Sequence, residues 1–257
     1  MGSWLARLEA WVRLHPVAGS RGHAQLADEI VRTLAAGGLS VSRHAHATGD
    51  LLVARCRGAG PLLGVYGHYD VAPGGRTDLL ATADRVFGRG VGDNLGPLAL
   101  RLSVLERYEG RANLLWVIEP GEEGGSVALA DWFDSSGNPQ VDLWLDETGY
   151  FDVGGMQRVL GLGITEELAD VLRRCGSLAA TMGRATRREE RTLRRVVTDA
   201  ASNVERLFQG APYVALGPND DHSDVHGEHE SLPLDTIELS MRQFEVLLDM
   251  AAGASGR

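Results

Sequence analysis

The sequence feature that most constrains the fold of this chain is the alternation of short apolar runs with segments of helical periodicity. The runs favour β-strands, and many of the segments between them carry apolar residues at every third or fourth position, which is typical of amphipathic helices. Strands that alternate with helices predict an α/β fold, here a three-layer α/β/α sandwich with a mainly parallel central sheet. The expected strands lie at 39–43, 50–56, 61–67, 113–118, 141–145, 157–161 and 212–216.

Helices are expected at both ends of the chain and between the strands. The apolar spacing from Leu5 to Val12 and from Ala27 to Leu34 predicts two helices before the first strand. The others are expected at about 94–108, 125–134, 165–175, 187–208 and 235–252. Because there is no internal repeat and no long linker, the 257 residues predict a single domain over 1–250 and a flexible Gly/Ser/Ala tail over 251–257.

Composition excludes several kinds of function. All 25 basic residues are arginines, so the chain can have neither a phosphate-binding loop with its lysine nor a Schiff-base lysine. The net charge of -10 argues against a nucleic acid or an anionic membrane as main partner, and favours a small molecule or a short peptide. No apolar run approaches the ~20 residues of a membrane span, and the first residues do not resemble a signal peptide, so a cytoplasmic location is expected.

Polar side chains follow four of the expected strands. His68 comes directly after the run at 61–67, and Asp146 directly after the run at 141–145. Two neighbouring glutamates, Glu122 and Glu123, follow the run at 113–118, and His226 lies in a loop after the run at 212–216. In open parallel sheets the ligand crevice lies beyond the carboxyl ends of the strands. The sequence therefore predicts that residue types suited to metal binding meet in one crevice.

Each of these groups also has a plainer interpretation when taken alone. Asp93 could be the N-cap of the helix that follows it, and the two glutamates could lie in a solvated loop. The segment 220–230, rich in His, Asp and Glu, could bind metal adventitiously. His68 and Asp70 lie on the same side of an extended chain, so the carboxylate could orient the imidazole. All five groups occur at a strand end or a helix start, and together they favour a functional metal site.

These residues resemble a known family. The motifs are Gly67-His68-Tyr69-Asp70-Val71-Ala72-Pro73, Gly88-Arg89-Gly90-x-x-Asp93, Glu122-Glu123-x-Gly-Ser126, Asp146 and His226-Gly227-x-x-Glu230. They are similar to those of the co-catalytic zinc metallopeptidases, which include carboxypeptidase G, succinyl-diaminopimelate desuccinylase, carnosinase and the aminoacylases. The resemblance extends from about Leu14 to Leu248.

The resemblance implies a site with two zinc ions, for which Mn or Co could substitute. Asp93 would bridge the two ions. His68 and Asp146 would bind one ion, and Glu123 and His226 would bind the other. Two histidines and three carboxylates without a thiolate are a donor set that suits these metals.

The resemblance also implies the reaction, which is hydrolysis of an amide bond in a dipeptide or an N-acylated amino acid. Glu122 would be the general base for a water activated between the two metals, and Asp70 would orient His68. Two other functions stay open: a single-zinc aminoacyl transferase or cyclase resembling glutaminyl cyclase, and a metal-binding module without turnover. For the ligands, Glu147 competes with Asp146, and both His222 and His229 compete with His226.

Family members usually carry a lid domain, which also forms the dimer, between the fourth and fifth ligands. Here only 80 positions separate Asp146 from His226, so the lid is expected to be missing and a monomer is expected. Tyr150 and the stretch 151–156 are candidates to replace its contacts. A second candidate is an arginine cluster, although interleaved glutamates make a solvated helix face the simpler interpretation: Arg184, Arg187, Arg188, Arg191, Arg194 and Arg195.

Overall fold

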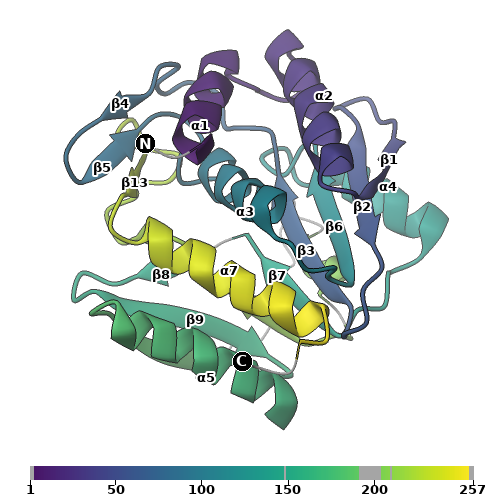
Figure 1. The fold of residues 1–257 in the computed structure, drawn as a ribbon. Helices are drawn as coiled ribbons and strands as arrows, with labels where there is room; N and C mark the ends of the chain where they lie inside the picture. Colours follow the sequence, from purple (N-terminus) through teal and green to yellow (C-terminus); the bar gives the residue numbers. More distant parts are fainter. Residues whose placement is uncertain (1–2, 148, 191–203, 209, 255–257) are drawn as a thin grey trace.

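A ten-stranded mixed sheet forms the middle of the structure, and helices cover it (Figure 1). This computed structural model describes residues 3–147, 149–190, 204–208 and 210–254. The strands of the sheet are β1 (Ser40–His44), β2 (Leu51–Cys56), β3 (Leu63–His68), β6 (Leu114–Glu119), β7 (Leu143–Asp146), β8 (Tyr150–Phe151), β9 (Met156–Leu162), β10 (Ala185–Glu190), β11 (Tyr213–Ala215) and β12 (Asn219–Asp220).

The helices follow the strands in the alternation expected from the sequence. They are α1 (Ser3–Leu14), α2 (Arg21–Ala36), α3 (Leu95–Arg107), α4 (Val127–Ser136), α5 (Glu166–Thr181), α6 (Val204–Leu207) and α7 (Ile237–Ala251). None of the helices in the described part of the chain is long and apolar enough to cross a membrane. A separate small antiparallel sheet contains β4 (Leu80–Ala81), β5 (Arg85–Phe87) and β13 (Ser231–Pro233).

The four central strands run parallel to one another. The strand order is β1-β2-β6-β3-β7-β11-β9-β8-β12, with β10 paired to β9. Parallel pairing joins β6 to β3, β3 to β7 and β7 to β11, while β1, β2 and β9 add antiparallel neighbours at the flanks. The carboxyl ends of β6, β3, β7 and β11 therefore meet at one edge of the sheet, where a ligand crevice is expected.

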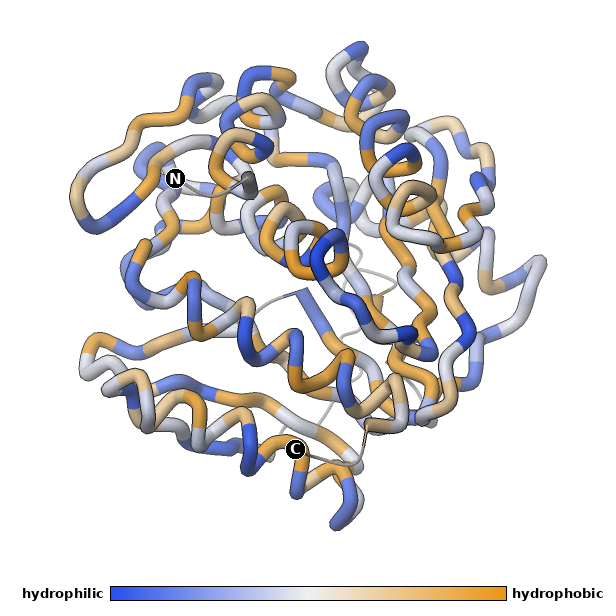
Figure 2. Tube along the Cα trace, viewed as in Figure 1, coloured by the Kyte–Doolittle hydropathy of each residue, from blue (hydrophilic) through white to orange (hydrophobic). Residues whose placement is uncertain are grey.

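Two hydrophobic layers hold the helices against the sheet. In β6, Leu114, Trp116 and Ile118 belong to the cluster that includes α1, α2, α3, α5 and α7. The alternate residues Leu115 and Val117 belong to a second cluster, with α4 and α6. Figure 2 shows hydrophobic residues along the central strands and on the helices. Burial on both faces explains why these strands are continuous apolar runs, and the predicted α/β/α sandwich is confirmed.

The largest error of the sequence-based assignment lies between α5 and β11. A helix was expected over 187–208, but the described residues up to 190 form β10, which pairs in parallel with β9. This strand is charged and lies beside a single neighbour, so it lacks the apolar pattern by which buried strands are recognised. Residues 191–203 lie outside the described part, as do 255–257 of the expected tail.

The described segment between β7 and β11 extends the main sheet. β9, α5 and β10 form a β–α–β unit, in which both strands add to the sheet and α5 packs against α7. The side chain of Thr165 caps α5 by accepting a hydrogen bond from the backbone N of Leu168. The described residues of this segment thus form no separate layer above the edge where the central strands end.

Candidate metal centre

His68 is the last residue of β3, and its imidazole is fully buried. Its Nδ1 lies 3.1 Å from Oδ1 of Asp70. The same carboxylate accepts hydrogen bonds from the backbone N of Glu122, at 3.1 Å, and of Glu123, at 3.2 Å. Asp70 therefore contacts the imidazole of His68 and accepts hydrogen bonds from the start of the glutamate loop.

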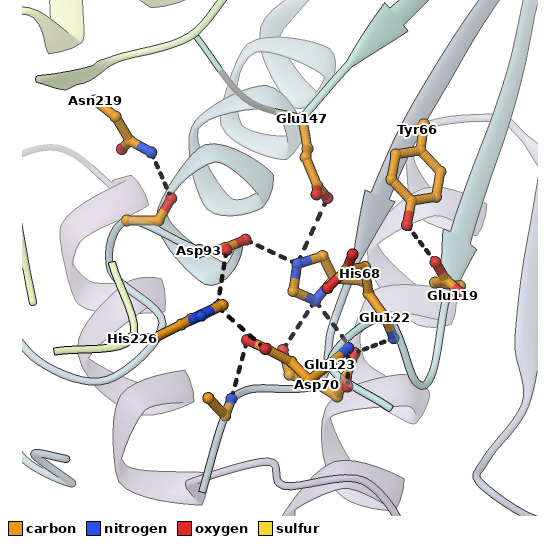
Figure 3. A network of polar contacts seen from close by, with 12 residues as sticks. Tyr66, His68, Asp70, Asp93, Glu119, Glu122, Glu123, Glu147, Asn219 and His226 are labelled. Atoms are coloured by element: carbon orange, nitrogen blue, oxygen red, sulfur yellow. Dashed lines mark hydrogen bonds and ion pairs between the residues drawn. The ribbon is translucent and has the colours of Figure 1, made fainter. Parts of the chain in front are cut away.

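Two groups of ligand atoms face each other across Asp93 (Figure 3). The first group, which we call the strand half-site, consists of His68, Asp93 and Glu147. The Nε2 of His68 lies 2.9 Å from Oδ1 of Asp93 and 3.5 Å from Oε2 of Glu147. The second group, the loop half-site, consists of Asp93, Glu123 and His226. In each group one donor atom per residue lies within 4.8 Å of the others.

The loop half-site uses the second oxygen of Asp93. The Nε2 of His226 lies 3.2 Å from Oδ2 of Asp93 and 3.1 Å from Oε2 of Glu123. The other oxygen of Glu123 accepts a hydrogen bond from the backbone N of Ala72 at 3.1 Å. His222 and His229 are exposed and belong to neither group. The structure therefore brings together four residues that were expected to be ligands: His68, Asp93, Glu123 and His226.

The structure does not bring Asp146 into either group, and Glu147 occupies the position expected for it. The Oδ2 of Asp146 accepts a hydrogen bond from the hydroxyl of Tyr213 at 2.7 Å, and its Oδ1 accepts one from the backbone N of Glu147 at 2.8 Å. Asp146 lies on the same side of β7 as Trp144, which packs in one cluster with Tyr213. The side chain at 147, one residue beyond the strand, is the one that reaches His68.

Glu122 belongs to neither half-site, but it interacts electrostatically with His68, Asp93 and His226. Burial raises the pKa of its carboxyl group; the charge of His68 opposes this rise, and the charges of Asp93 and Asp70 add to it. A carboxyl group that is not used as a ligand, and whose pKa is raised, can exchange a proton with a reacting molecule.

The electrostatics of the half-sites show carboxylates crowded together. Burial, followed by the charge of Asp93, raises the pKa of Glu123 to about 7 against the effect of His68. Burial also raises the pKa of Glu147 well above its usual value. Hydrogen bonds with His226 and His68 outweigh the effect of burial and keep the pKa of Asp93 far below its usual value. Within the described residues, the ion pairs of these three carboxylates are all with histidines.

The histidines respond to the same crowding. The hydrogen bond with Asp93 is the main reason that the pKa of His226 rises to about 9. Burial lowers the pKa of His68, but the charge of Glu147 and the hydrogen bonds with Asp70 and Asp93 together raise it well above its usual value. Oε2 of Glu147 is buried and has no hydrogen-bond partner in the described part of the chain. The imidazole nitrogens and carboxylate oxygens of the two groups form a donor set that fits Zn, Mn or Co.

Two buried residues behind the centre were missed by sequence reasoning. Arg101, in α3, is buried and donates to the backbone oxygens of Tyr66 at 3.1 Å, Asp146 at 2.5 Å and Leu216 at 3.3 Å. It thereby joins the carboxyl ends of β3, β7 and β11. Burial lowers the pKa of its guanidinium to about 10, while Asp146 and Glu147 oppose this change. The sequence could have indicated that Arg101 is buried, because it lies three residues after Leu98 and so on the apolar side of the helix.

The second missed residue is Glu119, which ends β6. Its Oε1 accepts hydrogen bonds from the hydroxyl of Tyr66 and from Oγ of Ser126, the latter at 2.8 Å. Ser126 closes the glutamate loop, because its backbone N donates to the oxygen of Gly121 at 2.9 Å. Burial raises the pKa of Glu119 to about 7, although these hydrogen bonds oppose the rise. Glu119 therefore supports the loop that carries Glu122 and Glu123.

Of the residues expected to replace the contacts of a lid domain, Tyr150 interacts with the candidate centre, whereas the described arginines whose ion pairs are known pair with other acidic residues. Burial, followed by the charges of Asp93 and Glu147, raises the pKa of Tyr150, so its hydroxyl group lies within electrostatic reach of the strand half-site. Arg184 pairs with Asp235 and lies over the ring of Phe151. Arg187 pairs with Glu189 on β10. Arg188 also lies on β10, whereas the remaining members of the arginine cluster lie outside the described residues: Arg191, Arg194 and Arg195.

Residues 64–249 match the model of peptidase family M20/M25/M40. No curated protein matches the chain.

Among solved structures, the fold is similar to an M20 family metallo-carboxypeptidase, Sso-CP2 from Sulfolobus solfataricus, with a TM-score of 0.76 and 14% identity over 98% of this chain and 100% of that chain. It is also similar to human carnosine dipeptidase 1, with a TM-score of 0.73 and 12% identity over 96% of both chains. The di-peptidase Dug1p from Saccharomyces cerevisiae gives a TM-score of 0.72 and 12% identity over 98% of this chain and 96% of that chain. At these identities the structural similarity describes the fold.

Proposed function

The chain belongs to peptidase family M20/M25/M40, and from this premise we propose that it is a two-metal hydrolase that cleaves the amide bond of a dipeptide or an N-acylated amino acid. The observation that carries the proposal is the position of Asp93, whose two oxygens face two separate half-sites. Glu122 belongs to neither half-site but interacts electrostatically with residues of both. A metallopeptidase requires both features: a place for metal and an acid–base group that is not a ligand.

The residues of the two half-sites would hold the metal ions. His68 and Glu147 would complete the strand half-site and Glu123 and His226 the loop half-site, with Asp93 shared. When bound, two such ions polarise a carbonyl oxygen and make a water molecule more acidic. Zinc is the metal that this donor set fits best, with Mn or Co as substitutes.

Glu122 performs the proton transfers in this proposal. Its carboxylate takes a proton from the attacking water as the water oxygen forms a bond to the amide carbon. It then gives that proton to the amide nitrogen, the C–N bond breaks, and a carboxylate and an amine leave. The raised pKa of Glu122 supports this role, because a general base works best when its pKa lies near the working pH. Asp70 holds the imidazole of His68 and the backbone of the glutamate loop in place throughout.

The substrate class rests on the chemistry of the chain and on its relatives. The net charge of -10 disfavours a nucleic acid or an anionic membrane surface as partner. The described relatives include a carboxypeptidase and two dipeptidases, so dipeptides and N-acylated amino acids are the first compounds to test. A single-zinc cyclase is the alternative, and the presence of two half-sites weighs against it. We further propose a cytoplasmic monomer consisting of one domain over residues 1–250.

The experiment is a zinc-loaded assay that compares dipeptides with N-acetyl and N-succinyl amino acids, using the wild-type protein and Glu122→Gln. Loss of general-base catalysis is expected to lower kcat by about 100-fold to 10,000-fold. The zinc content should stay near two ions per chain in both proteins, because Glu122 is not a ligand. Unchanged hydrolysis by Glu122→Gln would overturn the mechanism, and a stoichiometry of one would favour the cyclase.

A further inference from the structure

We propose that the buried ion pair between Arg89 and Glu230 is a positioning pair that sets the metal affinity of the loop half-site. The inference rests on the proposed function, since it assumes that the half-sites bind metal. Neither residue is a ligand, and the two act through hydrogen bonds to the backbone next to Asp93 and at His226.

Glu230 holds the backbone at Asp93. Its side chain is 2% exposed. Its Oε1 accepts hydrogen bonds from the backbone N of Gly92 at 3.0 Å and of Asp93 at 3.1 Å. Its Oε2 accepts one from Arg89 at 2.7 Å. A charged acceptor that binds two consecutive amides fixes the direction in which the Asp93 side chain leaves the chain.

Arg89 holds the backbone at His226. Its guanidinium is 4% exposed and donates to the backbone oxygen of His226 at 3.0 Å and to that of Gly74 at 3.2 Å. The space around it is tight, because a Cβ atom at Gly75 would lie 2.8 Å from its Nε. Arg89 and Glu230 together connect three loops, two of which carry residues of the loop half-site.

His226 needs such support more than the other candidate ligands do. Its side chain is 50% exposed, so few packing contacts restrain the imidazole. Its φ is +66°, a left-handed backbone conformation that is strained for a residue other than glycine and persists where the surroundings impose it. Asp224, two residues earlier, also has a positive φ. A hydrogen bond to the backbone oxygen of His226 is therefore a direct way to hold the imidazole toward Asp93.

The small antiparallel sheet brings the pair together. β5 pairs with β13, and Phe87 lies opposite Ser231 in the register. Just beyond this last pair, the backbone N of Gly88 donates to the oxygen of Glu230 at 3.1 Å. Arg89 and Glu230 thus lie at the end of a strand ladder and meet although 141 positions separate them in sequence. None of the candidate ligands lies in this small sheet. The sheet supports the centre by bringing Arg89 and Glu230 together.

The strand half-site is held by other groups. Asp70 contacts the imidazole of His68, and Arg101 binds the backbone at Asp146, directly before Glu147. Loss of the Arg89–Glu230 pair should therefore weaken metal binding at the loop half-site more than at the strand half-site, with Asp93 as the only shared residue.

The test measures zinc binding to the full chain by competition with a chromophoric chelator, in the wild-type protein, Glu230→Gln and Arg89→Lys. Glu230→Gln keeps the shape of the side chain but turns an amide donor toward Arg89. Arg89→Lys keeps the charge but cannot reach both backbone oxygens with a planar fork. In each variant the zinc affinity of the loop half-site, which we expect to be the lower of the two affinities, should fall by about 10-fold to 100-fold. A change of this size is typical when a partner of a metal ligand is lost. KM and kcat at saturating zinc should change less than the zinc affinity does.

Arg85→Lys is the matched control, because Arg85 lies on β5 and forms an ion pair with Asp220 that touches no half-site residue. It should bind zinc as the wild-type protein does. The proposal is overturned if folded Glu230→Gln and Arg89→Lys lose thermal stability but keep wild-type zinc affinity, or if Arg85→Lys shows the same loss of affinity. A wild-type protein that binds no zinc would instead overturn the proposed function. Wild-type protein that binds two ions and hydrolyses substrate, with variants of unchanged affinity, would overturn this inference alone.

Discussion

The two halves of the candidate centre share Asp93 but are built in different ways. In the strand half-site, His68 ends β3 and Glu147 directly follows β7, and both side chains are buried. In the loop half-site, Glu123 and His226 lie in loops, and half of the His226 side chain is exposed. Side chains on rigid strand ends need few additional contacts, whereas loop residues must be held by backbone hydrogen bonds. The difference predicts a tightly bound ion in the first half and a more readily exchanged ion in the second.

The largest expected effect separates Glu147 from Asp146. Glu147→Gln removes a charged ligand from the strand half-site and should weaken its zinc affinity by more than about 100-fold, beyond what is typical for losing a partner of a ligand. Asp146→Asn keeps an acceptor for the hydroxyl of Tyr213 and should retain two ions per chain. Metal analysis after gel filtration, together with the dipeptide assay, checks both variants. If Asp146→Asn lost an ion while Glu147→Gln kept two, the assignment of the strand half-site would be wrong.

Arg101 gives the next largest effect, on the stability of the strand ends. Arg101→Met leaves the buried backbone oxygens of Tyr66, Asp146 and Leu216 without their charged donor. We expect the free energy of unfolding to fall by roughly 3–5 kcal/mol, since each buried group left unpaired costs about 1–3 kcal/mol and some will find water. Urea denaturation of the metal-free protein measures this change. Arg107→Met is the matched control on the same helix, because Arg107 pairs with Glu245 at the surface. Equal stability of the two variants would argue against the strand ends depending on Arg101.

The smallest expected effect concerns Glu119, which supports the loop that carries Glu122 and Glu123. Because the pKa of Glu119 is raised from 4.5 to about 7, the folded state disfavours its ionised form. Its favourable contribution is fully present below pH 4.5 and is lost as the pH rises from 4.5 to about 7, by about 3 kcal/mol in total. Glu119→Gln stays neutral and should flatten this part of the pH dependence when urea denaturation is repeated from pH 4 to pH 8. An unchanged slope between the two proteins would show that Glu119 does not titrate in this range.

Most of the candidate centre could be predicted from sequence because its residues stand in short motifs after strands or before a helix, and the resemblance to the metallopeptidases implied which of them would be ligands. His68, Glu123 and His226 each come after an apolar run, and Asp93 precedes a helix. The choice between Asp146 and Glu147 could not be made in this way. A shift of one residue at a strand end reverses the side toward which a side chain points, and the turn that decides it is stabilised by Tyr213 and Arg101, which lie far away in sequence.

In the rest of the fold, too, features with a local sequence pattern could be predicted, and features that depend on distant contacts could not. The buried central strands were found within about two residues of their observed ends, because burial on both faces makes them continuously apolar. β10 was missed, since an edge strand need not be apolar on either face. The contact between Arg89 and Glu230 could not be predicted either, because it depends on the pairing of β5 with β13, which are far apart in sequence. Pairing between distant segments is decided by the whole fold and leaves no local pattern.

Because the carboxylate of Asp93 belongs to both half-sites, the binding of the two proposed ions would be thermodynamically linked. Oδ1 of Asp93 faces His68 and Oδ2 faces His226, so the charge that attracts the first ion is partly neutralised for the second. If an ion in one half-site changes the metal affinity of the other by some factor, an ion in the second half-site changes the affinity of the first by the same factor. In the proposed two-metal centre, the response to scarce metal would therefore depend on Asp93 and not on either half alone.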